Sequence, residues 1–207
     1  MLRRLLITWL TSLMCLPLTA WGCGTILIYG DSLSAAYGLS QDAGWPALLQ
    51  ARLKQEGMDY TVTNVSVSGE TSSGGAARIA EALKTHRPSV IIVALGANDG
   101  LRGLPPKQMR ANLTKIISES QQAKARVLLV GVRMPPNYGE TYTRQFAEVY
   151  ARLAREHKVA LVPVLLQGME QRSELFLSDN IHPTAAAQPI LLRNVWKALL
   201  PLLQRAG

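Results

Sequence analysis

Four short segments of small and polar residues interrupt this chain of 207 residues, and each contains a residue type that acyl transfer uses. The segments span residues 30–34, 68–71, 96–99 and 179–183. A serine hydroxyl is a poor nucleophile unless a neighbouring base removes its proton, and that base is usually a histidine that an acid holds in one tautomer. Ser32, preceded by a Gly30 that permits a tight turn, is therefore the candidate nucleophile. His182 is the candidate base and Asp179 the candidate acid.

The same segments contain candidate donors for the oxyanion that forms during acyl transfer. Several preorganised hydrogen-bond donors must face this charge. The N–H of Ser32, the N–H of Gly69, which no Cβ shields, and the side-chain amide of Asn98 can supply them. We expect Asp31 and Asp99 to support turns or helix caps instead of taking part in the chemistry.

Only one of the three histidines lacks a structural explanation. His86 and His157 end predicted helices, where a cation complements the helix dipole. His182 instead lies in a loop before a proline, with Asp179 three residues earlier. One turn of chain can therefore bring the Asp179 carboxylate to the imidazole Nδ1.

Composition and spacing argue against several other functions. The 22 Lys and Arg against 14 Asp and Glu leave a net charge of +8. These basic residues are scattered, which favours a solvated surface over a nucleic-acid site. No pair of His or Cys has metal-ligand spacing, and no glycine-rich phosphate loop follows a strand. We therefore expect no metal, no bound nucleotide and no nucleic-acid partner.

The N-terminus has the three-part plan of a secretory signal peptide. Arg3 and Arg4 form a positive start, residues 5–18 are largely apolar, and small residues stand at positions 20 and 22. This apolar run is shorter than the about 20 residues that span a bilayer. We predict a signal peptide over residues 1–22, export to the periplasm, and a single mature domain over residues 23–207.

The cysteines leave one alternative open for the N-terminus. Cys15 lies within the predicted leader, so cleavage leaves Cys23 without an internal disulfide partner. Cys23 would then be the acylated first residue of a lipoprotein. The preceding Ala-Trp-Gly favours ordinary cleavage, because a lipoprotein signal normally has Leu three positions before the cysteine.

Strand-like and helix-like segments alternate after the leader. Apolar strands are predicted over residues 25–29, 61–67, 89–95, 126–132 and 159–164. Amphipathic helices are predicted over residues 46–56, 73–86, 106–123, 141–157 and 184–203, the last with Pro189 in or near its first turns. This alternation indicates an α/β fold, a parallel sheet with helices on both faces. Ligand chemistry gathers at the carboxyl ends of such strands, where the four polar segments fall.

The four segments together resemble those of the SGNH/GDSL hydrolases, and in particular the bacterial periplasmic thioesterase I, lysophospholipase and arylesterase subgroup. The likeness covers nearly the whole mature chain, including residues 44–49, 98–103 and 136–139. It implies a three-layer, flavodoxin-like α/β/α fold with a five-stranded sheet. It also implies Ser32, Asp179 and His182 as a catalytic triad, and Ser32, Gly69 and Asn98 as an oxyanion hole.

The resemblance also suggests substrates and partners. It implies acyl-CoA thioesters, lysophospholipids, and aryl and short-chain acyl esters, hydrolysed without a cofactor. We expect transient contact with a membrane surface and a monomer. The expected substrate-binding residues are Leu33, Met134, Tyr138 and Ile181.

Two positions depart from the family pattern. Ala97 replaces the second Gly of Gly-Gly-Asn-Asp, and would be strained if that position needed a positive φ. Asn180 replaces the usual Gly before Ile-His, and Asn tolerates left-handed backbone best after Gly.

Two alternative functions stay open: a carbohydrate O-deacetylase on the same scaffold, and a catalytically silent acyl-binding module. A deacetylase often carries an added carbohydrate-binding domain, for which this chain has no room. A silent module should have lost part of the catalytic set, which is complete here.

Overall fold

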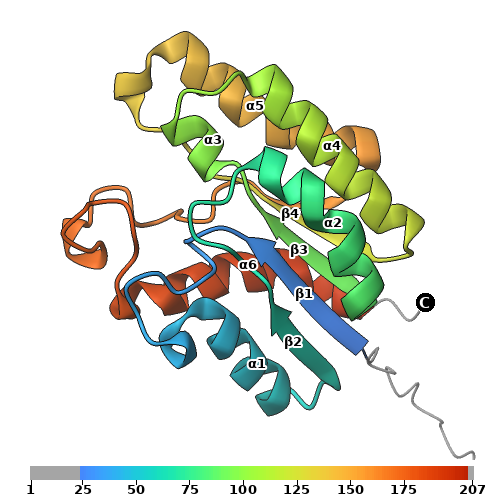
Figure 1. Cartoon of the computed structure of the whole chain (residues 1–207). Helices are drawn as coiled ribbons and strands as arrows, with labels where there is room; N and C mark the ends of the chain where they lie inside the picture. The colour runs from blue at the N-terminus through green and yellow to red at the C-terminus, as the bar shows by residue number, and fades with distance from the viewer. Residues whose placement is uncertain (1–23, 205–207) are drawn as a thin grey trace, which may run out of the picture.

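The computed structural model describes residues 24–204, and these form one parallel sheet between two layers of helices (Figure 1). The predicted leader, including Cys15, and Cys23 lie outside the described residues. The strands are β1 (Gly24–Gly30), β2 (Tyr60–Asn64), β3 (Val90–Ala94), β4 (Arg126–Val130) and β5 (Ala160–Val162). All pair in parallel in the order β2-β1-β3-β4-β5. The predicted five-stranded α/β/α fold is therefore confirmed.

Six α-helices lie in the described part of the chain, and all but the short α3 cover the sheet. They are α1 (Trp45–Gln55), α2 (Ser72–His86), α3 (Ala97–Leu101), α4 (Pro106–Gln122), α5 (Glu140–His157) and α6 (Gln188–Leu203). Helices α1 and α6 pack together on one face, while α2, α4 and α5 lie in a row on the other. None of the helices in residues 24–204 has both the length and the apolar character that crossing a bilayer needs.

The three central strands of the sheet, β1, β3 and β4, are buried on both faces, which explains why they are nearly continuous apolar runs. Every residue of β3 is buried, and so are the last five residues of β1. A strand that is covered on two sides has no solvent face, so the alternation of apolar and polar residues disappears. The core then continues into the aromatic residues of α5, where the Phe146 and Tyr150 rings meet edge to face.

The ends of α2 and α5 agree with the sequence interpretation, whereas the start of α6 does not. His86 and His157 are the last residues of α2 and α5, as predicted. Pro189 lies in the first turn of α6, where its missing N–H leaves no helical bond unmade. The α6 helix itself begins at Gln188, after a short 3₁₀ turn over Ala185–Ala187, and not at residue 184 as expected.

Other details also differ from the sequence expectation, since β4 and β5 end at Val130 and Val162 and not at residues 132 and 164. The helix α3 was not predicted, because five residues are too few to show a helical period. The second strand ends at Asn64 instead of continuing to residue 67. The N–H groups of Val65 and Val67 nevertheless still donate to the carbonyls of Ile28 and Gly30, so the chain stays beside β1 up to the polar segment.

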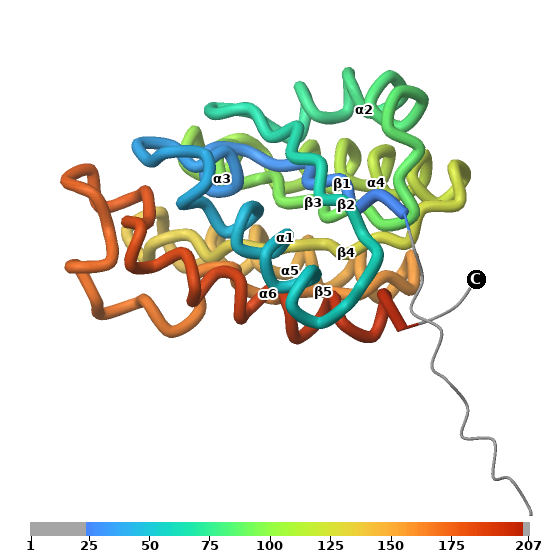
Figure 2. Tube along the Cα trace, turned by 90° about the horizontal axis from the view of Figure 1, so that it is seen from below, coloured from blue at the N-terminus to red at the C-terminus, as the bar shows by residue number. Residues whose placement is uncertain are grey.

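The polar segments converge at the carboxyl edge of the sheet. The loop after β1 and the long connection between β5 and α6 extend to the same side of the molecule in both views (Figures 1 and 2). They bring together Ser32 and His182, which lie 150 positions apart in the sequence.

Candidate active site

Ser32, His182 and Asp179 form one hydrogen-bonded line at this edge. The Ser32 Oγ lies 2.9 Å from His182 Nε2, and His182 Nδ1 lies 2.7 Å from Asp179 Oδ2. Because the carboxylate accepts from Nδ1–H, Nε2 is left free to accept the serine proton. The predicted trio is thus brought together in the arrangement that nucleophilic activation of a serine requires.

The turn that carries Ser32, residues 31–38, is here called the Ser32 turn. The buried Asp31 organises it, because the Asp31 Oδ1 accepts the N–H of Leu33 at 3.0 Å and its carbonyl accepts from Ser34 and Ala35. Burial raises the pKa of Asp31 from 3.8 to about 7, against the lowering effect of the Leu33 hydrogen bond. Asp31 therefore supports the turn, as expected for an aspartate in this position.

Gly30 is needed for space. A Cβ at this position would lie 2.9 Å from the Ser34 Oγ and 3.0 Å from the Ala94 carbonyl oxygen at the end of β3. Gly30 is not among the residues with a positive φ. The glycine therefore lets β1 turn directly into the Ser32 turn beside β3.

The segment that carries His182, residues 177–182, is here called the His182 turn. The Asp179 Oδ1 accepts the N–H groups of Ile181 and His182, both at 2.9 Å. The His182 N–H, then the imidazole, then the Ile181 N–H lower the pKa of Asp179 to about 2. Asp179 therefore remains a carboxylate throughout the physiological range.

The two departures from the family pattern have different outcomes. Asn180 has a φ of +56°, so this position does adopt the left-handed region that Asn tolerates. Ala97 is not strained, because Gly96 takes the positive φ of +117° and Ala97 begins α3. A Cβ on Gly96 would also lie 2.3 Å from the Tyr150 hydroxyl, so position 96 must be glycine.

Two of the predicted oxyanion donors lie outside the two turns: Gly69 in the loop between β2 and α2, and Asn98 in the short helix α3. The Asn98 side chain lines the same cavity as Ser32, and its Nδ2 donates one hydrogen to the Glu70 carbonyl at 2.9 Å. Nδ2 carries a second hydrogen, which this bond leaves unused. Gly69 has a φ of +80°, and its carbonyl accepts from the Arg102 guanidinium at 3.0 Å. Sequence reasoning missed the partners Glu70 and Arg102, because only the fold brings these segments together.

Asp99 connects α3 to the start of α2. Its buried carboxylate accepts the N–H of Ser72 at 2.7 Å and the Ser72 hydroxyl at 2.5 Å. Ser72 is the first residue of α2, so Asp99 satisfies an otherwise unpaired N–H at that helix end. This matches the expected supporting role.

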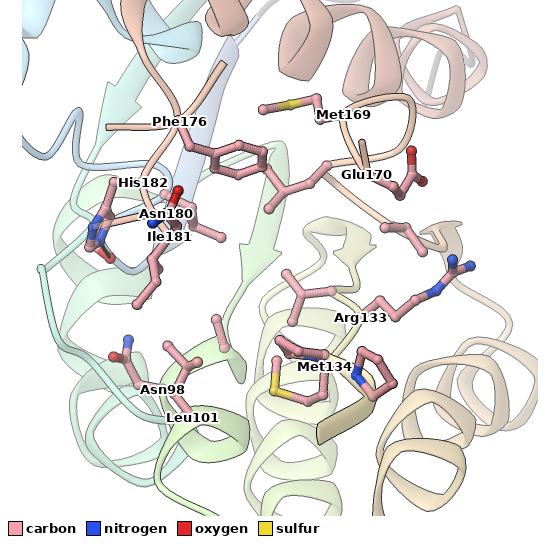
Figure 3. A pocket seen from close by; sticks show the side chains of 18 residues that line it. Asn98, Leu101, Arg133, Met134, Met169, Glu170, Phe176, Asn180, Ile181 and His182 are labelled. Atoms are coloured by element: carbon pink, nitrogen blue, oxygen red, sulfur yellow. Dashed lines mark hydrogen bonds between the residues drawn. The ribbon is translucent and has the colours of Figure 1, made fainter. Parts of the chain in front are cut away.

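A cavity of about 680 Å³ opens beside Ser32 and His182. Figure 3 shows His182 and Asn98 on one side and the charged Arg133 and Glu170 on the other. Its remaining wall is mostly apolar and includes Leu33, Leu101, Val132, Met134, Val164, Leu166, Met169, Phe176 and Ile181.

Three of the four predicted substrate-binding residues line this cavity. They are Leu33, Met134 and Ile181. Tyr138 is not among the lining residues, and its hydroxyl instead donates to the carbonyl of the lining residue Leu101 at 3.0 Å. The residues between 164 and 176 were missed, because that irregular stretch has no period to interpret. Within residues 24–204, no group of three or more His, Cys, Asp or Glu could hold a metal ion.

Known proteins provide an independent comparison. The esterase TesA of Pseudomonas aeruginosa is 48% identical over 179 residues, which is 86% of this chain and 89% of that protein. The thioesterase 1/protease 1/lysophospholipase L1 of Escherichia coli (strain K12) is 40% identical over 190 residues, 92% of this chain and 90% of the relative.

Solved structures agree with this comparison. The crystal structure of TesA superposes with a TM-score of 0.85, at 48% identity and covering 86% of this chain and 99% of the other. The psychrotrophic esterase EstA from Pseudoalteromonas sp. gives a TM-score of 0.84 at 38% identity, over 88% of this chain and all of the other. The GDSL-like lipase/acylhydrolase family pattern matches residues 28–189. The chain therefore belongs to the GDSL-like lipase/acylhydrolase family of hydrolytic enzymes.

Proposed function

We propose that this enzyme hydrolyses carboxylic ester and thioester bonds through an acyl-enzyme intermediate on Ser32. The observation that carries the proposal is the line from the Ser32 Oγ through the imidazole to Asp179, with contacts of 2.9 and 2.7 Å, at the mouth of an apolar cavity. Relatives named esterase, arylesterase and thioesterase/lysophospholipase support the same reaction class.

The proposed reaction has two halves. His182 removes the Ser32 proton while the Oγ attacks the acyl carbon, and Asp179 stabilises the imidazolium that forms. The oxyanion accepts from the N–H groups of Ser32 and Gly69 and from the Asn98 amide. His182 then donates its proton to the departing alcohol or thiol. A water molecule, deprotonated by His182, attacks the acyl-enzyme in the same way and releases the carboxylic acid and free Ser32.

The cavity supports an acyl chain as the bound part of the substrate. Its wall of Leu, Val, Met, Phe and Ile side chains removes an alkyl chain from water, which stabilises binding by roughly 25 cal/mol per Å² of apolar surface. We therefore propose acyl-CoA thioesters, lysophospholipids, and aryl and short-chain esters as substrates. A carbohydrate O-deacetylase would need polar groups for the sugar beside Ser32, and the mostly apolar wall disfavours it.

The nucleophile is tested by Ser32→Ala, with Ser68→Ala as the matched control for an exposed hydroxyl nearby. Ester hydrolysis should vanish in the first variant and persist in the second, while thermal unfolding of both stays close to wild type. A fluorophosphonate probe should label Ser32, and this reagent class is suggested by the EstA structure, in which that enzyme is inhibited by monoethylphosphonate. Labelling of Ser34 or Ser68 instead would overturn the assignment.

The substrate class is tested with p-nitrophenyl esters of increasing chain length beside palmitoyl-CoA and lysophosphatidylcholine. An apolar cavity of this size predicts a rise in kcat/KM from acetyl to medium-length acyl chains. The same panel should include an acetylated sugar as the deacetylase arm. Preference for the acetylated sugar over every acyl chain longer than acetyl would contradict the proposed class.

We also infer export, from the sequence of residues 1–22 alone. Intact mass and N-terminal sequencing of the periplasmic fraction should find a chain that begins near Cys23 and folds as one hydrolase domain. An added diacylglycerol mass would favour the lipoprotein alternative, and a full-length cytoplasmic product would contradict export. The monomeric state and the transient membrane contact stay predictions.

A further inference from the structure

The two hydrogen bonds of His182 leave its ring insufficiently constrained. One bond forms at each ring nitrogen, and the N–H and the lone pair of an imidazole both point along the ring plane. They fix the ring along the line between Asp179 and Ser32 but resist tilting about that line only weakly, since hydrogen bonds tolerate a broad range of angles. A contact against the face of the ring is what would hold its plane.

Tyr37 makes such a contact. The centroids of the Tyr37 and His182 rings lie 4.2 Å apart, with 33° between their planes. The Tyr37 side chain is 49% exposed, so the ring is not placed there to fill the core. An exposed aromatic ring laid on the face of a triad imidazole is a feature that the hydrogen-bonded line by itself does not explain.

The backbone around Tyr37 is shaped to place this ring. Tyr37 belongs to the Ser32 turn, where its N–H donates to the Ser32 carbonyl at 3.4 Å. Its neighbours Ala36 and Gly38 both have left-handed backbone, with φ of +56° and +73°. That region is disfavoured for alanine. Two closely spaced reversals therefore turn the chain around Tyr37.

Gly38 then docks the Ser32 turn against the His182 turn. A Cβ at position 38 would lie 2.7 Å from the Leu177 Cδ1. Leu177 in turn donates its N–H to the His182 carbonyl at 2.7 Å. The absence of a side chain at Gly38 thus lets the two turns meet one residue away from the Tyr37–His182 contact.

We propose that Tyr37 is a positioning residue for His182, which holds the imidazole plane between Asp179 and Ser32. When the serine proton is transferred, the ring becomes a cation, and the π-face of Tyr37 attracts it. The role rests on the ester hydrolysis proposed above. It deepens that proposal, because the turn that carries the nucleophile also supports the base that activates it.

The test compares Tyr37→Phe, which keeps the ring, with Tyr37→Leu, which keeps an apolar side chain without a π-face. On a soluble p-nitrophenyl ester, the Phe variant should stay within about twofold of wild type in kcat. The Leu variant should lose roughly tenfold in kcat with KM nearly unchanged, because a misplaced base slows the chemical step. Labelling by the fluorophosphonate probe should slow in parallel, since that reaction does not depend on the acyl cavity.

The pH profile separates positioning from a merely structural role. Without the π-face the protonated imidazole loses a stabilising contact, so the acidic limb of kcat/KM should move to lower pH by about half a unit in Tyr37→Leu. Val67→Ala is the control, because Val67 is similarly exposed, at 48%, and makes no ring contact with His182. Its kcat and profile should match wild type. If Tyr37→Leu fails to fold, Tyr37→Met takes its place.

Three outcomes would overturn the role of Tyr37. They are an unchanged kcat in Tyr37→Leu, a rise in KM alone, which would make Tyr37 a substrate contact, and equal losses in the Phe and Leu variants. Each leaves the proposed function intact. The proposed function itself fails if wild type hydrolyses no ester or if Ser32→Ala remains active, so the two failures are distinguishable.

Discussion

The Ser32 turn and the His182 turn are built by the same local device in opposite surroundings. In each, an aspartate Oδ1 accepts the N–H two residues later, Leu33 for Asp31 and Ile181 for Asp179. Asp31 is 1% exposed and its pKa rises to about 7, whereas the Asp179 side chain is 37% exposed and its pKa falls to about 2. The same local hydrogen bond therefore accompanies a raised carboxyl pKa in one turn and a lowered carboxyl pKa in the other.

The difference arises from what surrounds each carboxylate. Burial disfavours the charged form of Asp31, and hydrogen bonds from the backbone N–H groups of Leu33 and of Asp31 itself offset this only in part. Asp179 keeps contact with water and gains two backbone N–H groups and the imidazole of His182. We infer that Asp31 stabilises the fold of its turn, and that Asp179 stabilises the positive charge that forms on the His182 imidazole.

Among the changes that test this comparison of the two turns, Asp179→Asn should have the largest effect. The amide oxygen still accepts the backbone N–H groups, but the amide nitrogen now faces Nδ1 and forces the wrong imidazole tautomer, so kcat/KM should fall about 10³–10⁴-fold. Steady-state kinetics on an aryl ester measures the loss. Glu174→Gln is the control, an exposed acid from the same connection that pairs with Arg172, and its activity should be unchanged. Equal losses in both variants would make the effect of Asp179 nonspecific.

Asn98→Ala should have the next largest effect. It removes a donor to a charge that exists only in the transition state, so kcat should fall about 10²–10³-fold with KM little changed. Asn112→Ala is the matched control, because its amide donates to the Ser72 Oγ and does not line the cavity. That variant should alter stability and leave kcat intact. A rise in KM alone for Asn98→Ala would identify a binding residue and remove Asn98 from the oxyanion hole.

Asp31→Asn should change the pH dependence of stability instead of activity. The folded state raises the Asp31 pKa from 3.8 to about 7, so its contribution is fully present below pH 3.8 and is lost as pH rises through 7. For wild type, this site should lower the free energy of unfolding by about 2–3 kcal/mol between pH 5 and pH 8. Asp31→Asn should remove that slope, measured by denaturant titration at both pH values. A slope equal to that of wild type would show that Asp31 is already charged when folded.

The smallest effect concerns the non-glycine residue that has left-handed backbone in each turn. Asn180 and Ala36 share a φ of +56°. Asn180→Ala should destabilise the protein by about 1 kcal/mol, because a Cβ without a local polar group is disfavoured there. Asn180→Gly should stay within about 0.5 kcal/mol of wild type. Thermal unfolding measures both, and a fully tolerated Asn180→Ala would mean that the His182 turn relaxes.

The sequence was sufficient for those parts of the site whose geometry is local. The Asp179-x-x-His182 spacing predicts the carboxylate at Nδ1, because three residues of chain make one turn. The apolar strands place Ser32, Gly69 and Asn98 at one edge, because parallel strands in a doubly covered sheet all end on the same side. These predictions needed no knowledge of which helix packs against which.

The tertiary structure was needed wherever two distant segments meet. Nothing local to Tyr37 indicates that its ring lies on His182, and nothing in Asn98 indicates that Glu70 accepts its amide hydrogen. The stretch over residues 164–176, which forms part of the cavity wall, has no regular hydrophobic period in its sequence. Its side chains could therefore be assigned to the cavity only from their positions in the structure.

By itself, then, the sequence determined the fold class and the family, and it predicted which side chains the site brings together, because periodicity and short motifs are encoded within a few neighbouring residues. Only the tertiary structure decided which aspartate is buried, since Asp31 and Asp179 make the same local hydrogen bond. Burial depends on the layers packed over a residue, and those layers come from elements far away in the chain. The opposite pKa shifts of two similar turns follow from that packing.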